Sequence, residues 1–173
     1  MAAPAAPGEA SLSDGVLIAD FGSQVTLLIA RRLRERGVYC EIAPCHGLQQ
    51  RLETGPRPKA VILSGGPASA TGGDMPQAPA ALFAAGIPIL GICYGEQLLC
   101  AQLGGRVASA QGREFGPARI RVTRPSALFD GVLETGASAS VWMSHGDTVS
   151  ELPPGFAAIA ASDGAPFAAI ADE

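Results

Sequence analysis

The chain has 173 residues and a formal net charge of −4, with 47% hydrophobic and 16% charged residues. This is enough apolar material for a sizeable core and too little charge for a disordered chain. Because a general nucleic-acid-binding protein needs a basic surface, the acidic balance argues against that class.

The first fifteen residues are rich in Ala and Pro and predict a disordered tail, followed by one domain over residues 16–173. They have neither the basic start and Leu-rich core of a signal peptide nor the Arg residues of a mitochondrial presequence. The uncharged stretch 75–94 approaches the length of a membrane span. Its three prolines predict a helix, a turn and a strand instead. We therefore expect a cytoplasmic protein that does not contact a membrane.

Four cysteines, Cys40, Cys45, Cys93 and Cys100, form no C-x-x-C pair, and the two histidines are far apart in the sequence. A zinc site therefore has little support, and we expect no metal. Without a secretory signal, the cysteines are expected to be reduced thiols.

Short apolar runs alternate with segments of helical periodicity up to residue 103. The predicted strands are 16–19, 39–43, 60–63 and 87–92. The predicted helices are 48–54, 78–85, 94–103 and a segment that Ser23 caps and Gly37 ends. This alternation predicts an α/β fold, with an open, mostly parallel sheet flanked by helices on both faces.

The second part of the chain has shorter predicted strands without long helices between them. They are 107–110, 119–123, 141–143, 156–161 and 167–171. The simplest interpretation is an antiparallel extension of the parallel sheet.

The segment Gly91-Ile-Cys93-Tyr-Gly95 joins a predicted strand to a predicted helix and has the G-x-C-x-G pattern of a nucleophile elbow. The glycines permit a tight turn, and the N-terminal end of the helix favours the reactive thiolate. We therefore predict that Cys93 is a nucleophile with a lowered pKa. An isolated cysteine at a strand end is usually a core residue, which is what we expect of the other three.

Ser64-Gly65-Gly66-Pro67 also follows a predicted strand, and open α/β sheets place their sites at the carboxyl ends of strands. A glycine N–H can donate to an oxyanion there. A phosphate-binding loop is excluded because no Gly-Lys-Ser/Thr follows, which leaves a simple turn as the plain alternative.

The segment Trp-Met-Ser-His145-Gly-Asp147 contains one of the two histidines. A histidine beside a glycine is usually a loop or packing residue. As a general base for Cys93, His145 would need a hydrogen bond to the sulfur and an orienting carboxylate. Asp147 is close enough in sequence that a Cys93–His145–Asp147 triad stays an alternative.

These segments together resemble the class I (triad) glutamine amidotransferase domain, most closely in the form found in the GMP synthase family. The resemblance covers about residues 15–173 and implies a flavodoxin-like fold. The matching segments are 20–24, 31–35, 37–41, 62–67, 91–97, 103–105, 113–116 and 142–147.

The resemblance implies a role for each matching position. Cys93 would attack the side-chain amide of L-glutamine, form a glutamyl thioester and release ammonia. The main-chain N–H groups of Gly66 and Tyr94 would form the oxyanion hole. The residues implied in substrate binding are Gln97, Ser144, His145 and Gly146, which places His145 with the substrate and not as the base.

The sequence departs from the family pattern in ways that affect activity. The family's catalytic base belongs to a His-Pro-Glu segment, and no histidine follows His145. The Ser-Gly-Gly-Val-Asp-Ser loop of the ATP-pyrophosphatase domain is also absent. Glu96 stands where the family often has an uncharged residue. We therefore expect a C-terminally incomplete amidotransferase domain that is a poor glutaminase alone.

In the complete family enzyme, the ammonia converts XMP to GMP. The expected partner is the ATP-pyrophosphatase (synthetase) domain, in the same or a separate chain. It would hold ATP and Mg, and the amidotransferase domain itself would hold no cofactor. The alternatives are a non-catalytic module that binds glutamine or a partner, and a cysteine hydrolase that uses His145.

Overall fold

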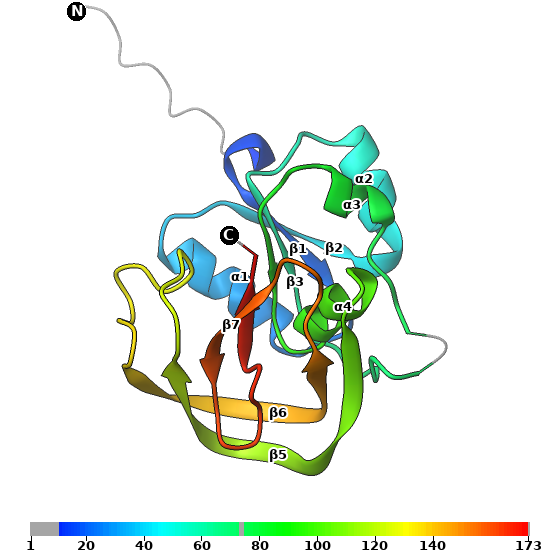
Figure 1. Cartoon of the computed structure of the whole chain (residues 1–173). Helices are drawn as coiled ribbons and strands as arrows, with labels where there is room; N and C mark the ends of the chain where they lie inside the picture. Colours follow the sequence, from blue (N-terminus) through cyan, green and yellow to red (C-terminus); the bar gives the residue numbers. More distant parts are fainter. Residues whose placement is uncertain (1–10, 73–74, 173) are drawn as a thin grey trace, which may run out of the picture. The chain divides into compact units, whose positions relative to one another are not determined.

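A computed structural model describes residues 11–72 and 75–172, with only the backbone for 110–114 (Figure 1). The chain divides into two compact units. The first consists of Met1–Pro67 and Pro76–Ile92, and the second of Ala68–Met75 and Cys93–Glu173.

The first unit contains a parallel four-stranded sheet, as the alternation of strands and helices predicts. Its strands are β1 (Val16–Asp20), β2 (Cys40–Pro44), β3 (Ala60–Leu63) and β4 (Ile89–Gly91). The strand order is β2-β1-β3-β4, and all neighbours are parallel. The order of the strands reverses between β1 and β3. Open α/β sheets place ligand sites at the carboxyl ends of such strands.

The helices of the first unit are α1 (Thr26–Glu35), α2 (Leu48–Thr54) and α3 (Ala80–Ala84). A core cluster brings α1 against the sheet and contains Ile18, Ala30, Cys40 and Ile62. The alternate side chains of β1 and β3 are also buried, among them Leu17, Val61 and Leu63. Burial of both faces is the usual property of a parallel sheet and explains why its strands are continuous apolar runs.

The predicted tail differs from the structure at its end. Residues 1–10 lie outside the described residues, but Leu12–Asp14 forms a 3-10 helix in which Leu12 is 1% exposed. The side chain of Ser11 accepts a hydrogen bond from the N–H of Ser13 and caps this turn. Burial of a leucine favours the ordered turn over a tail.

The start of α1 also differs from the prediction. The N-cap residue is Val25, which makes no side-chain cap, so Ser23 does not cap the helix. The Ser23 hydroxyl instead accepts from the N–H of Val25 at 3.1 Å, which closes a local turn. The first helical residue, Thr26, donates its hydroxyl to Asp20 at 2.8 Å and so ties the helix to the end of β1.

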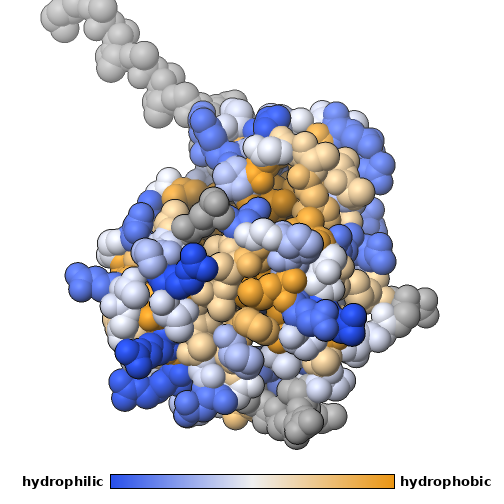
Figure 2. Space-filling model, in the orientation of Figure 1, coloured by the Kyte–Doolittle hydropathy of each residue, from blue (hydrophilic) through white to orange (hydrophobic). Residues whose placement is uncertain are grey.

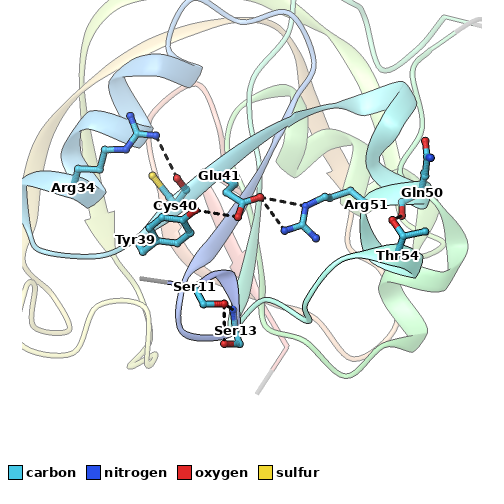
Figure 3. A network of polar contacts seen from close by, with 9 residues as sticks. All are labelled: Ser11, Ser13, Arg34, Tyr39, Cys40, Glu41, Gln50, Arg51 and Thr54. Carbon is cyan, nitrogen blue, oxygen red and sulfur yellow. Dashed lines mark hydrogen bonds and ion pairs between the residues drawn. The ribbon is translucent and has the colours of Figure 1, made fainter. Parts of the chain in front are cut away.

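Polar contacts fix the second strand between its helices (Figure 3). Glu41 of β2 accepts from the Nη2 of Arg51 in α2 at 2.8 Å and from the hydroxyl of Tyr39 at 3.1 Å. On the other side, Arg34 of α1 donates to the carbonyl of Cys40 at 3.3 Å.

The second unit consists of α4 (Tyr94–Gln102) and an antiparallel sheet. Its strands are β5 (Arg106–Val122), β6 (Ser138–Glu151), β7 (Ala157–Ala161) and β8 (Ala169–Ala171), in the order β6-β5-β7-β8. The predicted antiparallel strands are therefore present, but they form a sheet of their own.

The predicted strands 107–110 and 119–123 are parts of one strand, β5, which pairs with β6 along most of its length. Gly112, Gly116 and Pro117 interrupt the apolar pattern between them, and these residues normally mark a break. The register shifts between Ser109 and Glu114, where the pairing accommodates the irregularity.

Hydrophobic residues reach the surface of the face drawn in Figure 2. Among all described residues, the most exposed large hydrophobic side chains are Leu27, Val132 and Trp142, which are between 72% and 76% exposed. No helix among the described residues is both long enough and apolar enough to cross a membrane.

Candidate active site

Cys93 has an unusual backbone conformation, with φ 55° and ψ −114°. Within residues 11–72 and 75–172, it is the only residue other than glycine with a positive φ. The turn follows β4 directly and α4 begins at the next residue, so the predicted strand-turn-helix arrangement is present. Such strain is unfavourable and typically persists at functional sites, where it exposes a nucleophile on a sharp turn.

The thiol of Cys93 forms a hydrogen bond with β6. Its Sγ donates to the carbonyl of Ser144 at 3.6 Å, which brings two of the predicted site residues together. Partial removal of the thiol from water raises the pKa of Cys93. The N–H of Tyr94 acts in the opposite direction, and the nearby Glu96 adds to the increase. The predicted lowering of the pKa is therefore wrong, because desolvation outweighs the helix N-terminus.

Three of the four predicted substrate-binding residues, Ser144, His145 and Gly146, lie on β6. Ser144 is exposed and is paired with Phe115 of β5, and His145 follows it as a half-buried residue. Among the described side chains and backbone, apart from its own chain neighbours, no atom lies within 4 Å of the place that a Cβ of Gly146 would occupy, and its backbone needs no positive φ. Gly146 therefore faces open space, which is available to a ligand.

Gln97 is 8% exposed, and its side chain is oriented by β6. Its Nε2 donates to the main-chain carbonyl of Asp147 at 2.8 Å. The carboxylate of Asp147 accepts from the hydroxyls of Ser69 and Ser109, the second at 3.2 Å. Both carboxylate oxygens of Asp147 therefore accept hydrogen bonds from serines. This argues against Asp147 as the orienting carboxylate of a triad with His145.

Gly66 belongs to the first unit and lies at the reversal point of the parallel sheet. A Cβ at this position would lie 2.7 Å from the carbonyl oxygen of Phe21 and 3.1 Å from its Cβ. Glycine is therefore needed for the close approach of the segments that follow β1 and β3. Tyr94 belongs to the second unit and is 1% exposed. The oxyanion roles of Gly66 and Tyr94 stay predictions.

Substitution of Gly66 by Ala is expected to destabilise the fold by about 1–3 kcal/mol, because the added methyl group overlaps a backbone carbonyl. The measurement is urea unfolding followed by circular dichroism. Gly47→Ala is the control, since its Cβ would make an ordinary 3.6 Å contact with Pro44. Equal stabilities of the two variants would contradict the expectation.

Glu96 is a residue of the site whose burial the sequence analysis missed. Its Oε1 is buried and has no hydrogen-bond partner among the described residues. Burial raises the pKa of Glu96 to about 8. In the sequence, the indication of this buried group is a carboxylate three residues after Cys93, on the helix that follows the nucleophile.

The other three cysteines are free thiols, and two of them are in the core as predicted. Cys40 is 3% and Cys100 0% exposed, whereas Cys45 is only half-buried in a 3-10 turn. The prediction for Cys45 is therefore only partly correct. The side chains that the structure describes contain no group of three or more His, Cys, Asp or Glu suited to a metal ion.

Comparison with known proteins gives a match to the family model described as glutamine amidotransferase class-I over residues 17–173. Curated relatives are described as GMP synthase (glutamine-hydrolyzing). The one from Bartonella quintana is 59% identical over 162 residues, and the one from Rhodopseudomonas palustris (strain BisB18) is 56% identical over 167 residues. These matches cover 92% and 96% of this chain but 31% of each relative. The chain thus spans about a third of the length of these relatives.

Solved structures give the same fold. A protein from Thermoplasma acidophilum, described as one subunit of a GMP synthase, matches with a TM-score of 0.75 at 26% identity, over 95% of this chain and 80% of that chain. A glutamine amidotransferase from Thermotoga maritima matches with a TM-score of 0.71 at 21% identity, over 91% of this chain and 71% of that chain. The second likeness concerns the fold alone.

Proposed function

Because the chain belongs to the class I glutamine amidotransferase family, we propose that it hydrolyses the side-chain amide of L-glutamine to supply ammonia for the conversion of XMP to GMP. The observation that carries this proposal is the strained Cys93 at the turn between β4 and α4. A cysteine held in this way can form a covalent acyl intermediate.

The proposed reaction has two steps. The Cys93 thiolate attacks the amide carbon, the carbonyl oxygen becomes an oxyanion, and collapse of the tetrahedral intermediate releases ammonia and leaves a glutamyl thioester. Water then adds to the thioester, releases glutamate and regenerates the thiol. The N–H groups of Gly66 and Tyr94 would stabilise both oxyanions.

Proton transfer is the demanding part of this reaction. Because the pKa of Cys93 is raised, the thiol holds its proton at neutral pH and a base must remove it when glutamine binds. The departing nitrogen also needs a proton, and a positioned acid–base group contributes about 100- to 10,000-fold. We propose that this group is a histidine outside these 173 residues, so that the chain alone is a poor glutaminase.

Glutamine would bind along β6 and the first turn of α4. Gly146 leaves open space for the substrate, and Ser144 lies beside the nucleophile. His145, on the same strand, and the oriented side chain of Gln97 would complete the site.

The partner that receives ammonia would be an ATP-pyrophosphatase (synthetase) domain, in the same or a separate chain. It would bind ATP and Mg and give the assembly the activity of a carbon–nitrogen ligase. The amidotransferase domain would need no cofactor, and the assembly would work in the cytoplasm. The length of the relatives, of which this chain covers 31%, supports a further domain.

Gly146→Ala tests the proposed glutamine site without disturbing the fold. Since the new methyl group would meet no described atom within 4 Å beyond its chain neighbours, the thermal unfolding midpoint should not change. Glutamine should protect Cys93 from iodoacetamide, and the glutamine concentration needed for half protection should rise by about tenfold in the variant. Equal protection of the variant and the wild type would contradict the site.

A non-catalytic glutamine-binding module is the second candidate, and the raised pKa of Cys93 favours it. Such a module would show the protection by glutamine but no thioester. Rapid acid quenching followed by mass spectrometry distinguishes them, because only the hydrolase gives Cys93 with a glutamyl group attached.

A further inference from the structure

A cluster of hydrogen bonds around Asp147 joins separate segments of the second unit. The hydroxyl of Ser69, in the loop 68–72, donates to Oδ2 of Asp147. The hydroxyl of Ser109 on β5 donates to Oδ1 at 3.2 Å. The main-chain carbonyl of Asp147 accepts from Nε2 of Gln97 on α4 at 2.8 Å. One residue of β6 therefore holds β5, α4 and this loop.

The donor directions in the cluster follow from the chemistry of the groups. A hydroxyl has one proton, and that of Ser69 goes to the carboxylate. The hydroxyl of Thr71, 2.7 Å from Ser69 Oγ, must then be the donor in their contact. The N–H of Thr71 also donates to Ser69 Oγ, at 3.2 Å. Asp147 thus orients the loop through Ser69. The Oγ of Ser69 in turn accepts hydrogen bonds from the hydroxyl and the N–H of Thr71.

We propose that Asp147 is a positioning residue for glutamine, which holds the loop after Gly66 with its carboxylate and the side chain of Gln97 with its carbonyl. This inference rests on the proposed function. Ser69 follows Gly66 by three residues in the chain and lies in the loop that the carboxylate holds. Gln97 lies one helical turn after Cys93. The hydrogen bond to Asp147 therefore fixes the Gln97 side chain close to the nucleophile.

Two physical reasons make the carboxylate suited to this task. Hydrogen bonds to an ionised acceptor are shorter and stronger than bonds between neutral groups. A small displacement of a substrate-positioning group also reduces binding and reaction rate out of proportion to its size. Asn at position 147 keeps the shape of the side chain but has one acceptor oxygen instead of two.

The test measures the labelling of Cys93 in the 173-residue chain by two electrophiles. A chloromethyl ketone analogue of glutamine must bind before the thiolate displaces chloride and forms a thioether, so its rate saturates with concentration. Iodoacetamide needs no binding site and reports the reactivity of the thiol alone. In Asp147→Asn, the half-saturating concentration of the ketone should rise by about tenfold, with the iodoacetamide rate unchanged within about twofold.

Ser69→Ala should give part of the same increase, and the double variant Ser69→Ala/Asp147→Asn should equal Asp147→Asn, because the two residues act through one contact. Asp163→Asn, at an exposed position, is the matched control and should label like the wild type. If Asp147→Asn does not fold, as judged by circular dichroism, Ser69→Ala alone decides.

Two results would overturn the inference. One is an unchanged half-saturating concentration in the folded variants. The other is an equal loss of both labelling rates, which indicates general damage to the Cys93 turn. A wild-type rate that does not saturate contradicts the proposed function and, with it, this inference.

Discussion

A glutamine-like electrophile is expected to label Cys93 before Cys45, and both before Cys40 and Cys100. Cys93 is exposed on a strained turn, whereas Cys40 and Cys100 are buried in the core. Burial also raises the pKa of Cys100 to about 11, so it is almost entirely protonated near neutral pH. Peptide mapping after partial reaction gives the order of labelling.

The thiolate is the nucleophile, and the pKa of Cys93 is raised above the ordinary thiol pKa of 9.0. The rate of Cys93 labelling should therefore continue to increase above pH 9.0. Below the pKa, each pH unit should increase the rate by about tenfold. Cys93→Ser should reduce the rate of labelling by the glutamine analogue by a factor on the order of 10⁴ or more. Cys45→Ser is the control and should behave like the wild type. Labelling of Cys100 first would contradict the assignment of the nucleophile.

Glu96→Gln is expected to change the pH dependence of stability. Because the folded-state pKa of Glu96 is raised from 4.5 to about 8, the folded protein keeps a proton that the unfolded chain loses. The stabilisation of the folded state by this bound proton is complete below pH 4.5 and is lost as pH rises to about 8. Its size is at most about 5 kcal/mol, since a tenfold change in a protonation equilibrium corresponds to about 1.4 kcal/mol.

Urea unfolding at intervals from pH 4.5 to 8.5 measures this loss. The wild type should become less stable over the range, and Glu96→Gln should show a flatter profile. Above about pH 8, where Glu96 is ionised, the same substitution also removes a negative charge near Cys93, so the pKa of the thiol should fall. Glu151→Gln is the control, since Glu151 is exposed on β6. Parallel profiles of the wild type and Glu96→Gln would contradict a buried, protonated Glu96.

The sequence by itself determined the elements whose local patterns agree with their surroundings. The strand Ala60–Leu63 and the helix Leu48–Thr54 have the predicted bounds, because a continuous apolar run suits a strand buried on both faces and helical spacing suits a helix with one buried face. The turn at Cys93 was predictable as well, since two glycines frame a cysteine between a strand and a helix. The family resemblance depended on the same local motifs.

The tertiary structure decided the features that depend on distant neighbours. The extent of β5 could not be predicted, because its pairing with β6 overrides the glycines and the proline within it. The close approach to Phe21 that Gly66 requires joins residues that are 45 positions apart in the chain (66 − 21).

The electrostatics of the candidate site also depended on the tertiary structure. The sequence placed Cys93 at a helix N-terminus and so predicted a lowered pKa, but partial removal of the thiol from water raises it. Glu96 holds a proton because its carboxyl group is removed from water, and a one-dimensional pattern contains no measure of desolvation. The contacts of Asp147 with Ser69 and Gln97 likewise exist only once the chain has folded, because the three residues are far apart in sequence.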